Sequence, residues 1–145
     1  MASNPAYSDI TPEIEMLADL ALSNSTIDPN DFGRYNVKRG LRDLNGKGVL
    51  AGLTEIADVH ASETLPDGTT VPCEGELYYR GYNIKDLVKG FVKDQRLGFE
   101  ETAYLLMFGQ LPDRKQLKDF NDQLCMYRSL PSNFVRDVIL KAPSH

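Results

Sequence analysis

The two histidines are the side chains best suited to acid–base chemistry near neutral pH, because an unperturbed imidazole titrates there. His60 is the internal one, and in an extended segment Asp58 lies on the same face, since side chains alternate along a strand. No nucleophile or third group completes a catalytic constellation around this pair. We therefore interpret His60 as a structural or surface residue, and we assign no catalysis to His145, the final residue.

Glu100 and Glu101 form an adjacent pair of carboxylates at the start of an expected helix. Consecutive helical residues point roughly 100° apart, so the two groups are poorly placed to act together as acid and base. Negative charge at this place stabilises the helix instead, because it faces the positive end of the helix dipole. We predict a structural role for both residues.

Arg80 lies among tyrosines in a short segment bounded by Gly75 and Gly81. A guanidinium in such a place suits a buried ion pair or a contact with a carboxylate ligand, and we prefer the structural pairing. The neighbouring aromatic residues are compatible with a pocket wall, but aromatics at a strand-to-helix junction more often form the core and its rim. These residues are Tyr78, Tyr79 and Tyr82.

The thiols and loops form no recognisable metal or phosphate site. Cys73 and Cys125 stand far apart, outside any Cys-x-x-Cys pair, and we expect both as reduced thiols. A basic cluster lies before residue 48, which we interpret as a solvated loop rather than an anion site. Its members are Arg34, Lys38, Arg39, Arg42 and Lys47. No dinucleotide fingerprint, phosphate-binding loop or nucleophile elbow is present, so the sequence predicts no catalytic, cofactor-binding or metal-binding residue.

Length and charge exclude several classes of protein. The chain has 145 residues and a formal net charge of −5, with acidic and basic residues interspersed. It lacks the basic stripe that holds nucleic acid or an anionic membrane, and no apolar run approaches the roughly 20 residues that span a bilayer. The amino terminus lacks the pattern of a signal peptide. These features predict a soluble, cytoplasmic protein that binds neither nucleic acid nor membranes.

Residues 74–92 change from a strand pattern to a helical one. The segment 76–80 is short and aromatic, which favours a strand. From Asn83 onward, apolar residues follow helical spacing: Ile84, Leu87, Val88, Phe91 and Val92. Asn83 is the expected N-cap, with Asp86 three residues later as in a capping box, and Tyr82 and Leu87 at the places of a hydrophobic staple.

Further helices are expected on either side of this junction. Thr11 and Pro12 start the first, with an apolar face that packs on this chain or on a partner subunit; we prefer the former. FEETAYLLMF (residues 99–108) is the third, buried on more than one side and ended by Gly109. Asp113 and Gln116 suggest a capping box for the next. A last helix is expected from Pro131 to Pro143. The predicted apolar faces are Ile14, Leu17, Ala18 and Ala21 in the first helix; Leu117, Phe120, Leu124 and Tyr127 in the helix that starts at Asp113; and Phe134, Val135, Val138 and Ile139 in the last.

The remaining segments are expected to be connector and irregular β-structure. Residues 23–48 contain Asp28-Pro29 and Asn45-Gly46, which indicate turns. Residues 49–59 favour a strand, and residues 69–71 are expected to pair back toward 55–61 across the turn at 66–68. The predicted fold class is mainly α, with a small irregular β-element near residues 49–80. We divide the chain into a helix and connector (1–48) and the start of a large helical domain (49–145).

Three segments occur in an order that carries a family resemblance: VKRGLRDLNGKGVLAGLTEIADV (37–59), YRGYNIKDL (79–87) and FEETAYLLMFGQLP (99–112). Together they resemble the amino-terminal part of the large helical domain of the citrate synthase family, over residues 35–143. The family condenses acetyl-CoA with oxaloacetate and hydrolyses the thioester to citrate and CoA. Its aspartate base, two histidines and carboxylate-clamping arginines lie in later segments, so the resemblance assigns none of them here.

The resemblance implies a scaffold segment that is inactive alone, with the remainder of the synthase chain and a second copy in a homodimer as partners. It implies no cofactor; acetyl-CoA is a substrate. Two alternatives stay open. One is a segment of 2-methylcitrate synthase, which uses propionyl-CoA. The other is a stand-alone module for binding or oligomerisation, because broad apolar faces at residues 12–22 and 103–108 would be exposed without further helices.

Overall fold

The structure is a computed structural model that describes residues 9–43, 46 and 48–142. The predictions for Asn45, Lys47, Pro143 and His145 lie outside these residues. Helices and strands follow in the order α1 (Pro12–Ser23), α2 (Pro29–Arg34), β1 (Ala57–Thr64), β2 (Thr70–Tyr79), β3 (Tyr82–Asn83), α3 (Ile84–Lys93), α4 (Phe99–Phe108), α5 (Arg114–Tyr127) and the π-helix η1 (Val135–Ile139). The fold is mainly helical, as predicted, with one small antiparallel sheet.

The core lies where α1, α4 and α5 meet. Tyr104, Phe108 and Phe120 are buried and contact one another edge to face, with ring centroids 4.5–5.8 Å apart. Such aromatic pairs add about 0.5–1.5 kcal/mol each beyond the area that they bury. Leu105, which lies on α4, is also fully buried. The prediction that residues 103–108 are buried on more than one side is confirmed for Tyr104, Leu105 and Phe108, whereas Met107 is half exposed.

The helix starts follow the local signals. Thr11 caps α1 and Pro12 is its first residue; Asn83 caps α3; Asp113 and Gln116 form the reciprocal capping box of α5. Gly109 ends α4 at φ 77°, as a C′ glycine should. One detail differs, because Asp86 accepts from Lys89 Nζ at 3.1 Å and α3 has only the Asn83 cap.

α1 packs within the chain, as preferred from its sequence. Its Leu17, Leu20 and Ala21 lie against the aromatic core, while Met16 stays 65% exposed. Ala18, which the spacing placed on the buried face, is exposed. The contact of α1 with the core therefore covers only one side of the apolar surface of α1, and the other side is exposed to solvent.

The sheet is a hairpin with a short third strand, in the order β1-β2-β3. The bounds and the pairing of its strands differ from those predicted from the sequence. Strand β1 begins at Ala57, so residues 49–56 are not strand, and β2 runs through Gly75 instead of starting after it. Val71 pairs with Glu63, while residues 57–60 pair with 76–79. The prediction failed because seven of the eight β1 residues are exposed, which leaves no apolar alternation to set the register.

Two helical segments also differ from expectation. Asp28 accepts from Asn30 N at 2.8 Å, and Pro29 is the first residue of α2, so the dipeptide interpreted as a turn is an N-cap followed by N1. The last helix starts at Val135 rather than near Pro131 and is a five-residue π-helix. Most of its apolar face is half exposed, which removes the packing that would extend an α-helix.

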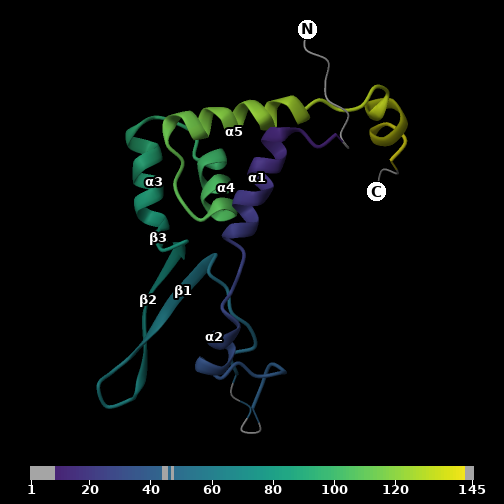
Figure 1. Cartoon of the computed structure of the whole chain (residues 1–145). Coiled ribbons are helices and arrows are strands. Elements are labelled where there is room, and N and C mark those ends of the chain that lie inside the picture. The colour runs from purple at the N-terminus through teal and green to yellow at the C-terminus, as the bar shows by residue number, and fades with distance from the viewer. Residues whose placement is uncertain (1–8, 44–45, 47, 143–145) are drawn as a thin grey trace.

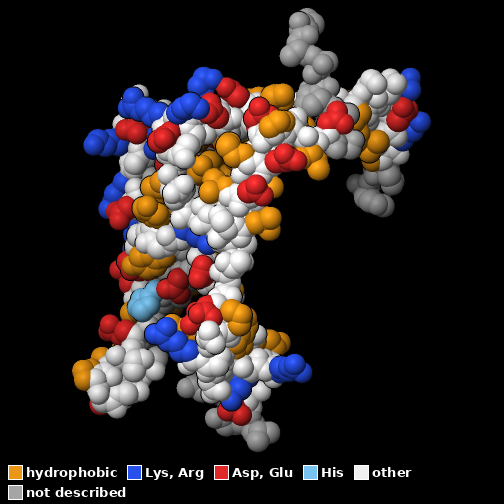
Figure 2. Space-filling model, viewed as in Figure 1, with side chains coloured by type: hydrophobic (Ala, Val, Ile, Leu, Met, Phe, Trp, Pro, Cys, Tyr) orange, Lys and Arg blue, Asp and Glu red, His pale blue; other side chains and the backbone are white. Residues whose placement is uncertain are grey.

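The elements form a helical head with a long arm (Figure 1). α5 runs across the top, with α1, α3 and α4 beneath it, and the hairpin and α2 extend away below. η1 projects beyond the end of α5. The chain exposes 11,698 Å², against ~7,500 Å² for a compact monomer of this mass. Figure 2 shows hydrophobic side chains reaching this open surface beneath α5. In the part of the chain that the structure describes, no helix is both long and apolar enough to cross a bilayer.

Candidate functional site

His60 and Asp58 lie on β1, where both side chains are exposed. His60 pairs in register with Glu76 and Asp58 with Tyr78 on β2. On the paired strand β2, the Tyr78 hydroxyl donates a hydrogen bond to Glu76 Oε2. That bond holds the pKa of Glu76 below its usual value and raises the pKa of Tyr78. The Glu76 carboxylate is thus hydrogen-bonded to Tyr78 and Asn83 rather than to His60.

Arg80 joins the arm to the head. Its guanidinium donates to Leu106 O from Nε at 3.3 Å and from Nη2 at 3.2 Å, and to Asn24 O from Nη2 at 3.2 Å. Leu106 lies in the last turn of α4, where unpaired carbonyls and the negative end of the dipole favour a cation. The Arg80 main-chain N–H also donates to Ile56 O at 2.9 Å. The preferred structural role is confirmed, although the partners are carbonyls rather than a carboxylate.

A shallow hollow of about 300 Å³ lies beside Arg80, and of the three neighbouring tyrosines only Tyr78 lines it. Tyr78 and Arg80 line it together with Glu55 and Asp58, while Tyr79 is half-buried and Tyr82 is 42% exposed. Charged side chains and few apolar ones line the hollow, whereas ligand pockets are mostly apolar. None of the three tyrosines is buried or belongs to the aromatic core, so the interpretation of these residues as part of the core is wrong.

The remaining sequence candidates are dispersed. Glu100 accepts from Arg128 Nη2 at 2.8 Å, tying the start of α4 to the end of α5, and Glu101 pairs with Arg96. Cys73 and Cys125 are free thiols on different elements. The described members of the basic cluster are all exposed. Among the described residues, no group of three or more His, Cys, Asp and Glu side chains could hold a metal ion.

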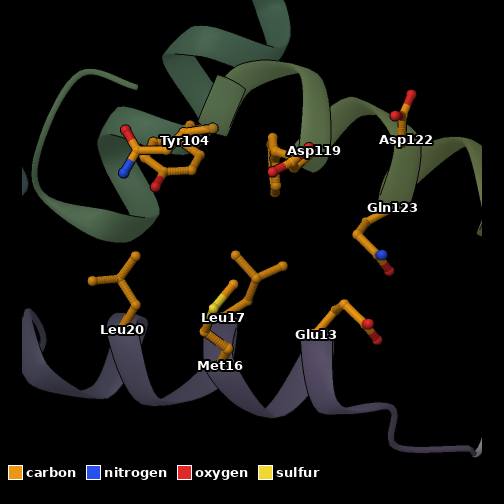
Figure 3. A pocket seen from close by; sticks show the side chains of 10 residues that line it. Glu13, Met16, Leu17, Leu20, Tyr104, Asp119, Asp122 and Gln123 are labelled. Carbon is orange, nitrogen blue, oxygen red and sulfur yellow. The ribbon is translucent and has the colours of Figure 1, made fainter. Parts of the chain in front are cut away.

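A groove of about 530 Å³ lies between α1 and α5 in the helical head. Figure 3 shows Leu17, Leu20 and Met16 facing it from α1 and Tyr104 from the opposite wall. Phe120 completes the apolar floor. Burial raises the pKa of the Tyr104 hydroxyl, as expected of a phenol set in an apolar wall.

The rim of the groove is acidic. Glu13, Asp119 and Asp122 line it, and none of the described lysines and arginines does. Asp119 accepts from Lys115 and Asp122 from Lys118, but these lysines lie one turn back, outside the groove. Gln123, also at the rim, has its Oε1 shielded from solvent without a hydrogen-bond partner. An apolar floor with acceptor groups around it suits a docked helical segment with basic residues better than a reaction centre.

Sequence reasoning did not find this groove. One indication of it was present in the sequence, the width of the apolar face of α1. Met16 and Leu20 make this face wider than packing against a single neighbouring helix requires. The other wall comes from α4 and α5, far away in the chain, and the angle at which α1 crosses them is a tertiary property. The groove therefore required the structure.

Comparison with known proteins gives the family. The model of the citrate synthase, C-terminal domain family matches residues 41–145. The chain belongs to the citrate synthase family. It is 35% identical to 2-methylcitrate synthase 1 of Corynebacterium glutamicum over 68% of this chain and 20% of the relative. It is 37% identical to a citrate synthase of Saccharolobus solfataricus, over 63% and 22%.

A glyoxysomal citrate synthase of Cucurbita maxima is 34% identical over 68% of this chain and 18% of its own length. The chain thus spans about a fifth of the length of the curated relatives that it matches. No solved structure matches the chain. The resemblance inferred from residues 37–112 is confirmed by the family match.

Proposed function

We propose that this chain is a scaffold segment of a citrate synthase, which condenses acetyl-CoA with oxaloacetate to give citrate and CoA, and that the segment alone is inactive. The family match supports the assignment, together with relatives named citrate synthase. The condensation needs a base for a weakly acidic C–H and donors for the developing oxyanion. His60 and Asp58 are instead exposed, and Glu100 and Arg80 are engaged in structural contacts.

The observation that carries the proposal is the open surface of the helical head. Val88 and Val92 on the predicted α3 stripe are 48% and 70% exposed, and Leu97 and Phe99 are 89% and 74% exposed. The helices of the head thus leave much of their apolar surface exposed. This supports a role for the chain as one layer of a larger helical domain. We propose that further segments of the synthase cover this side, in a cytoplasmic homodimer.

The test begins with the native product. An antibody raised against this chain is used to measure the size of the antigen in an extract of cells that express it, and to purify it. A product several times heavier than the 16.2 kDa chain supports the proposal. A product of the chain's own size, without synthase activity, overturns it in favour of a stand-alone binding module.

Activity is measured as thiol release from acetyl-CoA with oxaloacetate, with oxaloacetate omitted as the control. The purified native product should release CoA, and the chain alone should not. Turnover by the chain alone would contradict its role as an inactive scaffold. The same assay with propionyl-CoA tests 2-methylcitrate synthesis, the second candidate, which is favoured by relatives with that name. A higher kcat/KM for propionyl-CoA than for acetyl-CoA would select it.

A further inference from the structure

We propose that the groove between α1 and α5 is the docking surface for one amphipathic helix from the remainder of the synthase chain, which brings apolar side chains to the floor of the groove and lysine or arginine to its rim. This inference rests on the proposed function, because the chain spans about a fifth of the length of the curated relatives that it matches and the partner helix comes from the rest.

The length of the groove matches the width of a helix. Its residues on α1 run from Glu13 to Leu20, and those on α5 run from Gln116 to Gln123. Each stretch rises about 10 Å, at roughly 1.5 Å per residue, which is close to the diameter of roughly 10–12 Å of an α-helix with its side chains. The lining positions recur at helical spacing, so α1 and α5 each turn one face to the groove over two turns. A third helix fits on these two walls by ordinary helix packing.

The floor of the groove is apolar and its mouth is adaptable. Leu17, Leu20, Tyr104 and Phe120 supply the floor, and Met16 at the mouth is 65% exposed. Figure 3 shows the side chains on α1 directed toward the opposite wall, with open space between. A methionine adapts readily to an incoming side chain. The surface therefore suits the apolar stripe of an amphipathic helix, in the general mode of a helix bound in a groove.

The charge of the rim favours a basic partner. Glu13, Asp119 and Asp122 line the groove, and none of the described lysines and arginines does. Lys115 and Lys118 pair with the two aspartates from outside the groove, and all four side chains are more than half exposed. Exposed pairs of this kind contribute little to stability, so the aspartates are readily available to another cation. Opposite charges across the interface would fix the orientation of the docked helix.

An acceptor without a donor at the rim favours the same partner. The Oε1 atom of Gln123 is shielded from solvent and has no hydrogen-bond partner among the described residues. Such an acceptor costs free energy until a donor reaches it. Lysine and arginine side chains carry donors only. A basic side chain over the rim would thus satisfy Gln123 and offset the acidic charge in one contact.

The test captures the partner helix in the native synthase. A photoreactive benzoylphenylalanine replaces Met16 at the mouth of the groove. A matched variant carries it in place of Val59, which is 72% exposed on β1 and outside the groove. After illumination, mass spectrometry of proteolytic fragments identifies the captured peptide. The Met16 variant should capture a peptide of the same chain, from outside the 145-residue sequence, with apolar residues at helical spacing and a lysine or arginine. The Val59 variant should not capture that peptide.

Charge reversal tests the rim. Glu13→Lys, added to the Met16 variant, should lower the yield of the captured peptide several-fold, because it places a cation where the partner helix presents its own. Glu15→Lys is the matched control and should leave the yield unchanged. Both glutamates are exposed in the first turn of α1 and lose the same contact with the helix dipole, but Glu15 does not line the groove. Equal losses in the two variants would overturn the assigned charge.

Failure of this proposal is distinguishable from failure of the synthase assignment. A native product of only 16.2 kDa without synthase activity would overturn both. A heavier product that releases CoA keeps the assignment. In that product, the docking proposal is wrong if Met16 captures no peptide, or a peptide without a basic residue. It is also wrong if the captured peptide comes from a second subunit or another protein, which a denaturing gel shows as an increase in the mass of the cross-linked product.

Discussion

At the scale of single residues, two glycines in helical context make opposite predictions. Gly109 has φ +77°, and a Cβ there would lie 2.6 Å from Asn24 Oδ1, whereas a Cβ at Gly90 would meet nothing within 4 Å. Gly109→Ala should lower the free energy of unfolding by about 1–2 kcal/mol or more, through left-handed strain and the clash. Gly90→Ala should raise it by about 0.5–1 kcal/mol, because alanine favours the helix. Urea unfolding measures both, and equal effects would refute the assigned backbone geometry.

Arg80 gives the second prediction at this scale. Arg80→Met removes the hydrogen bonds to Leu106 O and Asn24 O and leaves part-buried carbonyls at the ends of α4 and α1 without this donor. The expected loss is about 1.5–3 kcal/mol of unfolding free energy, the range for bonds to charged groups. Arg34→Met is the control, since Arg34 is 74% exposed and pairs 3.8 Å from Asp31; it should change stability by less than about 0.5 kcal/mol. Similar losses of stability in the two variants would argue against the proposed role of Arg80 in joining the hairpin to the helical head.

At the scale of helices and strands, the α4–α5 pair should respond to acid through Glu100. Its own main-chain N–H and the Arg128 guanidinium lower the pKa of Glu100 from the usual value of 4.5. A group with a lowered folded pKa stabilises the fold above its unfolded pKa, and that contribution disappears as pH falls through the folded pKa. Glu100→Gln should therefore be less stable than the unaltered chain at neutral pH, with the difference shrinking below about pH 4.5. Chemical denaturation at several pH values measures this, and a pH-independent difference would contradict the linkage.

The elements that the sequence predicted are those with local start signals. Thr11-Pro12, Asn83 and Asp113–Gln116 each satisfy orphan N–H groups within one turn, so they work before any tertiary contact forms. Asp28-Pro29 carries the same signal as Thr11-Pro12, but α2 is only six residues long and lacks an apolar stripe that would distinguish it from a turn. The register of β1 and β2 depends on pairing across the hairpin, and the exposed β1 offers no burial pattern from which to infer it.

The candidate site was less predictable than the fold for the same reason. That no catalytic residue could be assigned followed from residue types and spacing alone, and it stays a prediction for the whole chain. The groove depends on how α1 crosses α5, and Met16 and Phe120 give no sign in sequence that they share a hollow. Likewise Arg80 was singled out by its setting, but its carbonyl partners on α1 and α4 follow from tertiary packing.

At the scale of the whole molecule, the open surface predicts weak cooperativity. The unfolded chain would expose ~23,500 Å², so the observed 11,698 Å² means that folding buries about half of it, rather than the ~70% typical of this size. The denaturant slope m scales with the surface exposed on unfolding. The dilute chain should therefore unfold in urea with an m value about three quarters of that of a compact domain of equal length.

The same quantity should depend on which segments accompany the chain. If further segments of the synthase cover the open surface of the helical head, a longer chain buries more apolar surface per residue, so its m value relative to its length should approach that of a compact domain. Urea titrations followed by circular dichroism compare the 145-residue chain with the native product. An m value already typical of a compact domain for the chain alone would show that the head and hairpin collapse on themselves in solution, and would remove the surface on which the scaffold assignment depends.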